Sequence, residues 1–411
     1  MMSFLNSYQK KLSVIAFFIL FAFSVSIIYA QQASDKPATI SMNAKEKSLP
    51  VYKIGSHIFT KVSLNGDEKY WVIDTGAGST VIDSKYAKDK GLPEIGKSKA
   101  MGASGEVEIT IYNIPKFSVN DTTIENIPVI GFDVYGLFKR KYNIEVAGIL
   151  GFNFLSKYIV KVDYDNMMIT LFEPAQFKYQ GTGNKAKFQL SNNIILVPLM
   201  INNKYEGTFA LDTGASSTIF NYPYALKNKI TEMDGPDLKA FGAQGGFILK
   251  LIRFPEADFG GYALKNVVLG CPTEKPAGVL GTDAFSGTMG INILQNFVFY
   301  IDYPNETIYL EKGKKFDQEF PSDKSGLQLE VNKDKQYEII HISKKSAAES
   351  AGLKVGDIVT AINGKSLVEM SSIDEINSVF KDKDGTKIEL KIMRDVKELD
   401  IPLILKDPFK K

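Results

Sequence analysis

One short pattern occurs twice in the chain, and this repetition constrains the fold more than any other feature. Residues 71–83 read WVIDTGAGSTVID, and residues 209–220 read FALDTGASSTIF. In each copy an apolar run leads to an aspartate, a Thr-Gly turn follows, and β-branched residues resume. This order predicts strand, tight turn and strand, because glycine frees the backbone and the flanking residues favour sheet. The two aspartates, Asp74 and Asp212, stand 138 residues apart.

The repeat extends well beyond these two turns. Three further landmarks recur in the same order at offsets of 139 or 140 residues. They are GASG at 102–105 with GAQG at 242–245, GFNFL at 151–155 with GINIL at 290–294, and VDYDN at 162–166 with IDYPN at 301–305. Two domain-sized copies indicate a duplicated lobe and not a solenoid of short units.

A duplicated lobe brings the two aspartates together if a pseudo-two-fold axis relates the copies. Equivalent points near such an axis meet across it, as they do in a symmetric dimer. Two adjacent carboxyl groups cannot both ionise easily, so they share one proton. The ionised aspartate can then take a proton from a bound water while the protonated one donates to an amide carbonyl. This chemistry needs neither a metal nor another cofactor.

The residues around both aspartates resemble those of aspartic proteases. The resemblance rests on the turns Asp74-Thr75-Gly76 and Asp212-Thr213-Gly214 and on the hydrophobic-Gly elements Ile149-Leu150-Gly151 and Met289-Gly290. In the second copy Val279-Leu280-Gly281 also fits that element. The resemblance covers residues 51–312. It implies a mainly β, two-lobed acid-protease barrel fold, Asp74 and Asp212 as the catalytic pair, Thr75 and Thr213 interlocked between the lobes, and an extended peptide or protein substrate.

Each copy is only about 130 residues long and carries a Gly-x-x-Gly hairpin pattern. The chain therefore resembles two fused retropepsin-like halves more than pepsin. We expect one flap in each lobe, formed by Gly102, Ala103, Ser104 and Gly105 and by Gly242, Ala243, Gln244 and Gly245. Ordinary surface turns are the alternative interpretation.

Alanine follows Asp-Thr-Gly in both copies, at Ala77 and Ala215. A hydroxyl at this position could hydrogen-bond the ionised carboxylate and lower its pKa. Its absence predicts a less acidic pair, with activity that extends toward mildly acidic or neutral pH.

The two ends of the chain differ from the repeat. Residues 1–30 place Lys10 and Lys11 before an uncharged apolar run, which is the layout of a secretory signal peptide. We therefore expect an exported protein, in the periplasm, at the cell surface or secreted, with an N-terminal membrane anchor as the alternative if the run is retained. Residues 31–48 read as a linker, residues 49–183 as lobe 1 and residues 184–318 as lobe 2.

Residues 319–411 resemble a bacterial-type PDZ domain of the α+β class. The resemblance rests on AGLKVGD at 351–357 followed by ING at 362–364. It implies binding of an extended peptide, often a C-terminus, as an added strand. Gly326, Leu327 and Leu329 would form the peptide-binding loop. A module that only packs on the protease and stabilises it is the alternative.

The net charge, the histidines and the expected spacing of the carboxylates argue against other kinds of function. The net charge of +2 gives no reason to expect a nucleic-acid partner. His57 and His341 are the only histidines and lie in no ligand cluster, which argues against metal catalysis and against a Ser-His-Asp triad. We expect a monomer. Glycoside hydrolysis would need more widely spaced carboxylates. The competing hypothesis is a catalytically inactive peptide-binding scaffold.

Overall fold

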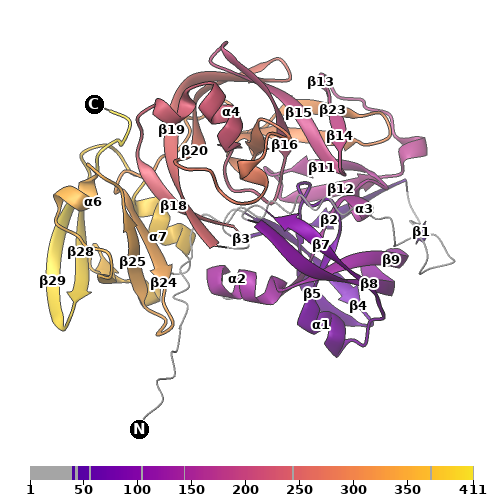
Figure 1. The fold of residues 1–411 in the computed structure, drawn as a ribbon, viewed down its shortest axis with the longest axis horizontal. Helices are drawn as coiled ribbons and strands as arrows, with labels where there is room; N and C mark the ends of the chain where they lie inside the picture. Colours follow the sequence, from indigo (N-terminus) through magenta and orange to yellow (C-terminus); the bar gives the residue numbers. More distant parts are fainter. Residues whose placement is uncertain are drawn as a thin grey trace, which may run out of the picture.

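The computed structural model describes residues 39–41, 45–54, 57–102, 105–142, 144–242, 245–370 and 373–410. The predicted signal peptide lies outside these residues. Four sheets account for most of the described chain, which confirms the mainly β fold class. Figure 1 shows the two lobes side by side and the C-terminal sheet beside the second lobe. None of the described helices is long and apolar enough to cross a bilayer.

The first lobe is one sheet with the strand order β1-β9-β6-β10-β5-β4-β8-β7, with β3 paired to β4. Its elements are β1 (Thr39–Ser41), β3 (Tyr52–Ile54), β4 (His57–Leu64), β5 (Asp67–Ile73), β6 (Val81–Asp83), α1 (Ser84–Asp89), β7 (Glu94–Gly102), β8 (Gly105–Val119), β9 (Thr122–Phe132), α2 (Val134–Tyr142) and β10 (Val146–Leu150). An Asn65-Gly66 turn joins β4 to β5, and both residues have positive φ angles, as Asn-Gly hairpin turns require.

The second lobe repeats most of these strand pairings in a sheet with the order β14-β15-β16-β21-β17-β20-β19-β18, in which β15 also pairs with β19, as β4 pairs with β8 in the first lobe. Its elements are β14 (Gln189–Ser191), β15 (Ile194–Ile201), β16 (Tyr205–Leu211), β17 (Ile219–Phe220), α4 (Tyr222–Lys227), η3 (Ile230–Glu232), β18 (Asp237–Gly242), β19 (Gly245–Phe259), β20 (Tyr262–Pro272), η4 (Val279–Gly281) and β21 (Gly287–Met289). The lobes differ where α2 stands in the first and the loop with η4 in the second.

A third sheet, β13-β23-β22-β11-β12-β2, is shared by both copies. Its elements, with the adjoining short helices, are β2 (Glu46–Pro50), α3 (Phe152–Leu155), β11 (Ile159–Asp163), β12 (Met168–Phe172), η2 (Pro174–Gln176), β13 (Asn184–Lys187), α5 (Ile291–Leu294), β22 (Phe297–Asp302) and β23 (Thr307–Lys312). The central strands β11 and β22 pair antiparallel with Lys161 opposite Tyr300. These two residues are equivalent in the repeat, so the pseudo-two-fold axis passes between them.

The predicted linker over residues 31–48 differs from the structure in its described part. Thr39–Ser41 pair with β9, and Glu46–Ser48 belong to β2, which pairs with β12. The strand β2 is the counterpart of β13 in the second copy, so the first copy begins near Glu46. Polar composition alone does not show this, because an edge strand can carry polar side chains on its exposed face.

The C-terminal domain forms its own sheet with the order β24-β25-β26-β28-β29, and β27 pairs with β26. Its elements are β24 (Leu327–Val331), β25 (Tyr337–Ile342), α6 (Ala347–Ser350), β26 (Ile358–Ile362), β27 (Lys365–Ser366), η5 (Leu367–Glu369), α7 (Ile373–Val379), β28 (Lys387–Arg394) and β29 (Lys397–Ile404). A separate hydrophobic cluster, which includes Leu329, Ile376 and Ile392, forms its core.

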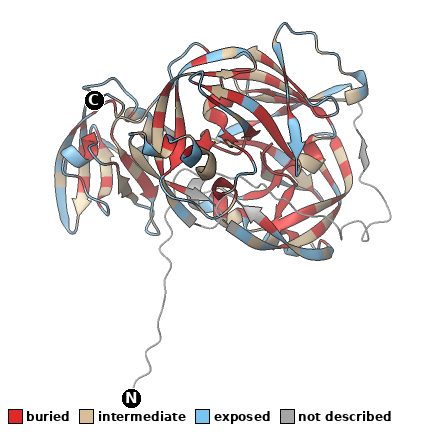
Figure 2. Ribbon diagram, turned by 45° about the horizontal axis from the view of Figure 1, so that its top comes forward, coloured by how far each residue is buried: buried red, intermediate tan, exposed pale blue. Residues whose placement is uncertain are grey.

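Buried residues in Figure 2 follow the strands through both lobes. One large cluster extends from Trp71 in the first lobe to Phe209 in the second and includes the central strands of the shared sheet. The lobes therefore share a continuous core, which holds their two halves in a fixed relation.

Candidate active site

Each aspartate follows directly after a central strand of its lobe. The N–H of Asp74 donates to Leu150 O at 3.1 Å, and the N–H of Asp212 donates to Met289 O at 3.0 Å. The strands β10 and β21 that supply these carbonyls run parallel to β5 and β16. Met289-Gly290 is therefore the counterpart of Leu150-Gly151, whereas Val279–Gly281 forms the short helix η4.

The threonines of the two turns are interlocked across the lobes. The N–H of Thr75 donates to Thr213 Oγ1 at 3.1 Å, and the N–H of Thr213 donates to Thr75 Oγ1 at 3.0 Å. Each hydroxyl also donates to the opposite lobe, from Thr75 to Leu211 O and from Thr213 to Ile73 O, both at 2.9 Å. These four buried hydrogen bonds follow the pseudo-two-fold symmetry, and they hold the two turns in a fixed relative position.

The two carboxyl groups face each other across the same axis. A Cβ atom placed on Gly76 would overlap the carboxyl of Asp212, and one placed on Gly214 would overlap that of Asp74. The Oδ1 atoms of Asp74 and Asp212 accept the N–H groups of Gly76 and Gly214 at 2.8 and 2.7 Å. The Oδ2 atoms accept no donor from the described residues. One oxygen of each aspartate therefore remains for a shared proton and a water.

Burial controls the electrostatics of this pair. Both aspartates are 0% exposed. Loss of hydration raises the pKa of Asp74 to about 7, against the hydrogen bonds that lower it. The pKa of Asp212 is raised well above its usual range by burial and then by the charge of Asp74. The direction agrees with the prediction made from Ala77 and Ala215, but the main cause is burial and not the missing hydroxyl.

Two tyrosines lie near the aspartate pair. In the sequence they are noted only as part of the repeated segments at 162–166 and 301–305. Tyr164 and Tyr303 occupy equivalent turns, after β11 and after β22. Burial raises the pKa of both phenols, and the charge of Asp74 raises it further in each case. Tyr164 Oη accepts or donates no hydrogen bond among the described residues. The repeated Asp-Tyr dipeptide was the available signal that these turns approach the aspartates.

The predicted flaps fall at the tips of two long hairpins. Gly102 pairs with Gly105 between β7 and β8, and Gly242 pairs with Gly245 between β18 and β19. The tip residues Ala103, Ser104, Ala243 and Gln244 lie outside the described residues. Both hairpins pack on the aspartate turns: Ala100 and Ile109 share a cluster with Ala77, and Ala240 and Leu249 share one with Ala215.

The predicted peptide-binding loop of the C-terminal domain already uses several of its own donors. The N–H groups of Ser325 and Gly326 both donate to Asp323 Oδ1 at 2.9 Å. The N–H of Leu327 donates to Ser325 Oγ at 3.2 Å. Leu327 and Leu329 are buried in the domain core. An incoming carboxylate would have to displace Asp323 to reach these amides.

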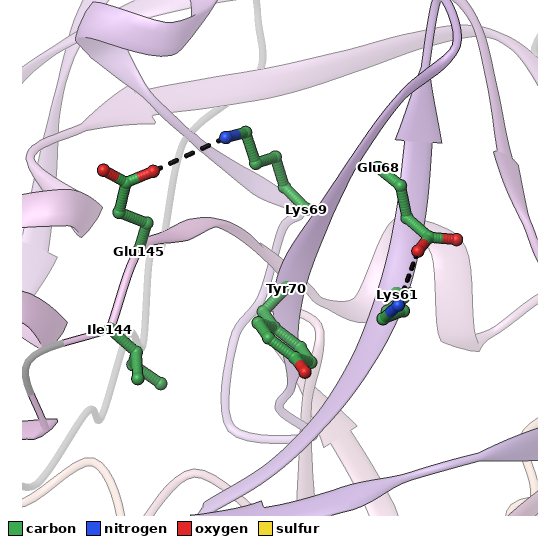
Figure 3. A pocket seen from close by; sticks show the side chains of 6 residues that line it. All are labelled: Lys61, Glu68, Lys69, Tyr70, Ile144 and Glu145. Carbon is green, nitrogen blue, oxygen red and sulfur yellow. Dashed lines mark hydrogen bonds and ion pairs between the residues drawn. The ribbon is translucent and has the colours of Figure 1, made fainter.

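A separate surface hollow of about 360 Å³ lies on the first lobe, lined by Lys61, Glu68, Lys69, Tyr70, Ile144 and Glu145. Figure 3 shows that its charged side chains pair with one another, Lys61 with Glu68 and Lys69 with Glu145. Its charges are thus internally balanced, and none of the predicted site residues lines it.

The fold and the paired turns define the class of two-lobed proteins with an acid-protease fold, and comparison with known families agrees. The family model described as aspartyl protease matches residues 60–154 and 197–284, one segment in each lobe. A PDZ domain model matches residues 315–393. The chain thus carries two retropepsin-like aspartyl protease segments and a C-terminal PDZ domain, as the sequence motifs predicted.

Curated relatives match over shorter stretches. A probable CtpA-like serine protease of Staphylococcus haemolyticus is 33% identical over 100 residues, which cover 24% of this chain and 20% of the relative. A protein of the same description from Staphylococcus saprophyticus is 31% identical over 123 residues, which cover 29% of this chain and 25% of the relative. The chain therefore matches a fifth to a quarter of these relatives' length.

Proposed function

We propose that this protein is an aspartic endopeptidase in which Asp74 and Asp212 activate a water for peptide hydrolysis. The single observation that carries the proposal is the pair of buried carboxyl groups that face each other across the pseudo-two-fold axis, each within an aspartyl protease segment. One shared proton makes one aspartate the base and the other the acid. Thr75, Gly76, Thr213 and Gly214 hold the pair, and the two hairpins close over the peptide.

The relatives are named serine proteases, so the catalytic type has to be argued from this chain's own site. Their matches cover less than a third of this chain. Of the two histidines, His57 packs against Phe138, and His341 pairs with Asp237 at 3.0 Å. Both imidazole side chains thus make these contacts with residues other than Asp74 and Asp212. These contacts support water activation by Asp74 and Asp212 over a histidine-assisted serine nucleophile.

The decisive experiment compares the wild type with Asp74→Asn and Asp212→Asn on a mixed peptide library, read by mass spectrometry between pH 4 and 8. We expect each substitution to reduce kcat by at least about 10³-fold, because both members of the pair take part in the same step. Asp133→Asn, a change of the same kind in the first lobe, should leave turnover unchanged. Undiminished hydrolysis by Asp74→Asn would refute the assignment.

Binding of a statine-containing peptide distinguishes the enzyme from an inactive scaffold. A transition-state analogue binds an active aspartate pair much more tightly than the corresponding substrate peptide. We expect a large thermal shift with the statine peptide and a small one with its unmodified counterpart. Equal shifts without turnover would favour the scaffold.

We also propose that the PDZ domain recruits a peptide along β24. This strand ends the order of its sheet, so one of its edges has no strand partner among the described residues. Added strands bind such edges through main-chain hydrogen bonds. The side chains of Asp323 and Ser325 already accept N–H groups of the loop. We therefore expect main-chain hydrogen bonds along the edge of β24, and not a terminal carboxylate, to supply the free energy of peptide binding. The remaining expectations, export and a monomeric state, are part of the same proposal.

A further inference from the structure

The PDZ domain is attached directly to the second flap hairpin. The side chain of Gln328, on β24, accepts the N–H of Lys239 at 2.8 Å and donates to Lys239 O at 3.3 Å. Both groups belong to the backbone of β18, the outermost strand of the second lobe's sheet. Figure 1 shows β18 next to β24 and β25. A glutamine side chain thus takes the place that a further strand would occupy on this edge.

A second group of contacts fixes the start of the same strand. Asp237 Oδ1 accepts Ser343 Oγ at 3.1 Å and the N–H of Lys344 at 3.2 Å, and its Oδ2 lies 3.0 Å from His341 Nε2. The N–H of Asp237 in turn donates to Ser343 Oγ at 3.0 Å. Ser343 is buried, so its two hydrogen bonds with Asp237 are partly shielded from water.

The PDZ domain also reaches the first lobe. In the pairing of β24 with β25, Gln328 lies opposite His341 and Leu329 lies opposite Ile339, so the register shifts and Ile340 is a bulge residue. A bulge redirects a side chain out of its regular alternation. Ile340 packs against the first-lobe cluster that contains Ala77 and Ala100 together with α2 residues such as Phe138. Its neighbour Ile339 remains in the PDZ core. The strand β25 therefore bridges both lobes on the side of the flaps.

The residues that the PDZ domain contacts on β18 are neighbours of residues that pack on the aspartate turns. Ala240, next to Lys239, shares a cluster with Ala215, which directly follows the Asp212-Thr213-Gly214 turn. Since Asp74 and Asp212 are 0% exposed, the residues packed around them have to move before a peptide can reach the two carboxyl groups. A hairpin moves as a unit, so whatever holds β18 also limits the movement of the second flap.

We propose that Gln328 and Asp237 are positioning residues that restrain the β18–β19 hairpin beside the Asp212 turn, and that Ile340 restrains the β7–β8 hairpin through the cluster that contains Ala100. The PDZ domain then controls access to the aspartate pair and is not only a recruiting module. This inference rests on the proposed function for its consequence, the control of peptide access. Its physical content, restraint of the hairpins by the PDZ domain, is independent of turnover.

Hydrogen exchange in the full chain tests the restraint directly. In Gln328→Ala we expect the amides of residues 246–250, on the second hairpin, to exchange about five-fold faster, the factor that corresponds to one lost hydrogen bond. Gln328→Glu keeps the acceptor for Lys239 N–H but loses the donor, so its effect should be smaller. Gln336→Ala makes the same chemical change at an exposed position of the same domain and should change nothing.

The first flap supplies the matched comparison. Ile340→Ala should accelerate exchange at residues 106–111 and leave residues 246–250 as in the wild type. Amides of β26 and β28 report on the PDZ fold and should keep their protection in every variant. The PDZ domain stays attached in these variants, because Arg253 on β19 still donates to Asp407 at 3.2 Å. Unchanged exchange in both hairpins, with the PDZ strands protected, would overturn the proposal.

Peptide binding then links the restraint to the site. Release of the second flap should increase the association rate of a statine-containing peptide several-fold in Gln328→Ala. If hydrolysis fails altogether, the exchange experiment still decides the restraint, so the two proposals can fail separately. Faster exchange without a change in the association rate would show that the hairpin does not limit access and would overturn the positioning role.

Discussion

The two lobes are close copies where they meet and different where they face away from the axis. Around the axis, Thr75 and Thr213 exchange the same hydrogen bonds, and Asp74 and Asp212 receive equivalent donors. Away from it, α2 in the first lobe is replaced in the second by the loop that contains η4. The hairpins differ too, since the PDZ domain hydrogen-bonds β18 of the second lobe but meets the first lobe through Ile340.

This difference shows which parts of a duplicated protein have to stay alike. Groups near the axis contact their own counterparts, so a change in one copy disturbs both. Groups far from the axis contact unrelated neighbours and can diverge independently. The symmetric region of this protein is therefore where its proposed chemistry lies, and the asymmetric region is where partners or regulation can be added to one side only.

Among changes that leave both aspartates in place, the largest effect is expected from filling the space between the turns. Gly76→Ala and Gly214→Ala each push a methyl group into the carboxyl of the opposite lobe. Displacing a catalytic group by about 1 Å costs roughly 10²-fold in rate, so we expect at least that loss in kcat/KM for either variant. Gly96→Ala is the control, because only Ile111 comes within 4 Å of its Cβ. Clearly unequal losses of kcat/KM in the two glycine variants would show that the two turns are not equivalent in the site.

The threonine interlock should be equally costly from either side. Thr75→Val and Thr213→Val each leave one buried N–H and one buried C=O without a partner, so each should lower the free energy of unfolding by about 2–4 kcal/mol. Thr122→Val and Thr288→Val are matched controls, one in each lobe, whose hydroxyls have no hydrogen-bond partner among the described residues. Chemical denaturation measures all four. A control as costly as the interlock variants would contradict this account.

The aspartate pair should make stability fall as pH rises. A carboxyl with a raised pKa in the native state favours folding below its unfolded pKa of about 4 and loses that contribution as pH rises through the native pKa, about 7 for Asp74. An asparagine side chain does not ionise, so it loses no stabilising contribution as the pH rises. We expect Asp74→Asn to be more stable than the wild type at pH 8 by about 2 kcal/mol or more, with little difference at pH 4, by thermal unfolding.

Asp357 in the PDZ domain is the control with the opposite sign. Burial disfavours its charge, but hydrogen bonds from Arg394 outweigh burial and lower the pKa of Asp357. Its contribution is present above the unfolded pKa and is lost as pH falls, so Asp357→Asn should destabilise the protein at pH 8. A wild-type stability that rises from pH 5 to 8 relative to Asp74→Asn would show that the pair is not buried in solution.

The smallest effect concerns the PDZ domain. If β24 supplies the edge for an added strand and Asp323 occupies the loop amides, a terminal carboxylate contributes little. Peptides that differ only in a free or amidated C-terminus should bind the full chain with Kd values within about three-fold, measured by fluorescence anisotropy. A ten-fold preference for the free carboxylate, about 1.4 kcal/mol, would show that the loop opens to receive it.

Much of this organisation could be predicted from the sequence because it is encoded in short local patterns. The turn at Asp74 requires Gly76, and the turn at Asp212 requires Gly214, so each motif carries its own structural reason. The offset between the copies then predicted that the aspartates meet, since equivalent points of a duplicated unit approach a common axis. The AGLKVGD motif likewise predicted the PDZ domain.

Other features depend on pairing between distant residues and were decided only by the tertiary structure. Val279-Leu280-Gly281 and Met289-Gly290 both fit the hydrophobic-Gly element; the repeated segment that begins at Gly290 favours the second, and the parallel pairing of β21 with β16 decides between them. The polar residues at 46–48 became a strand because β12 offered them a free edge. The attachment of Gln328 to Lys239 joins residues 89 positions apart. Local composition carries no record of such contacts, because their free energy arises only when the folded domains are brought together.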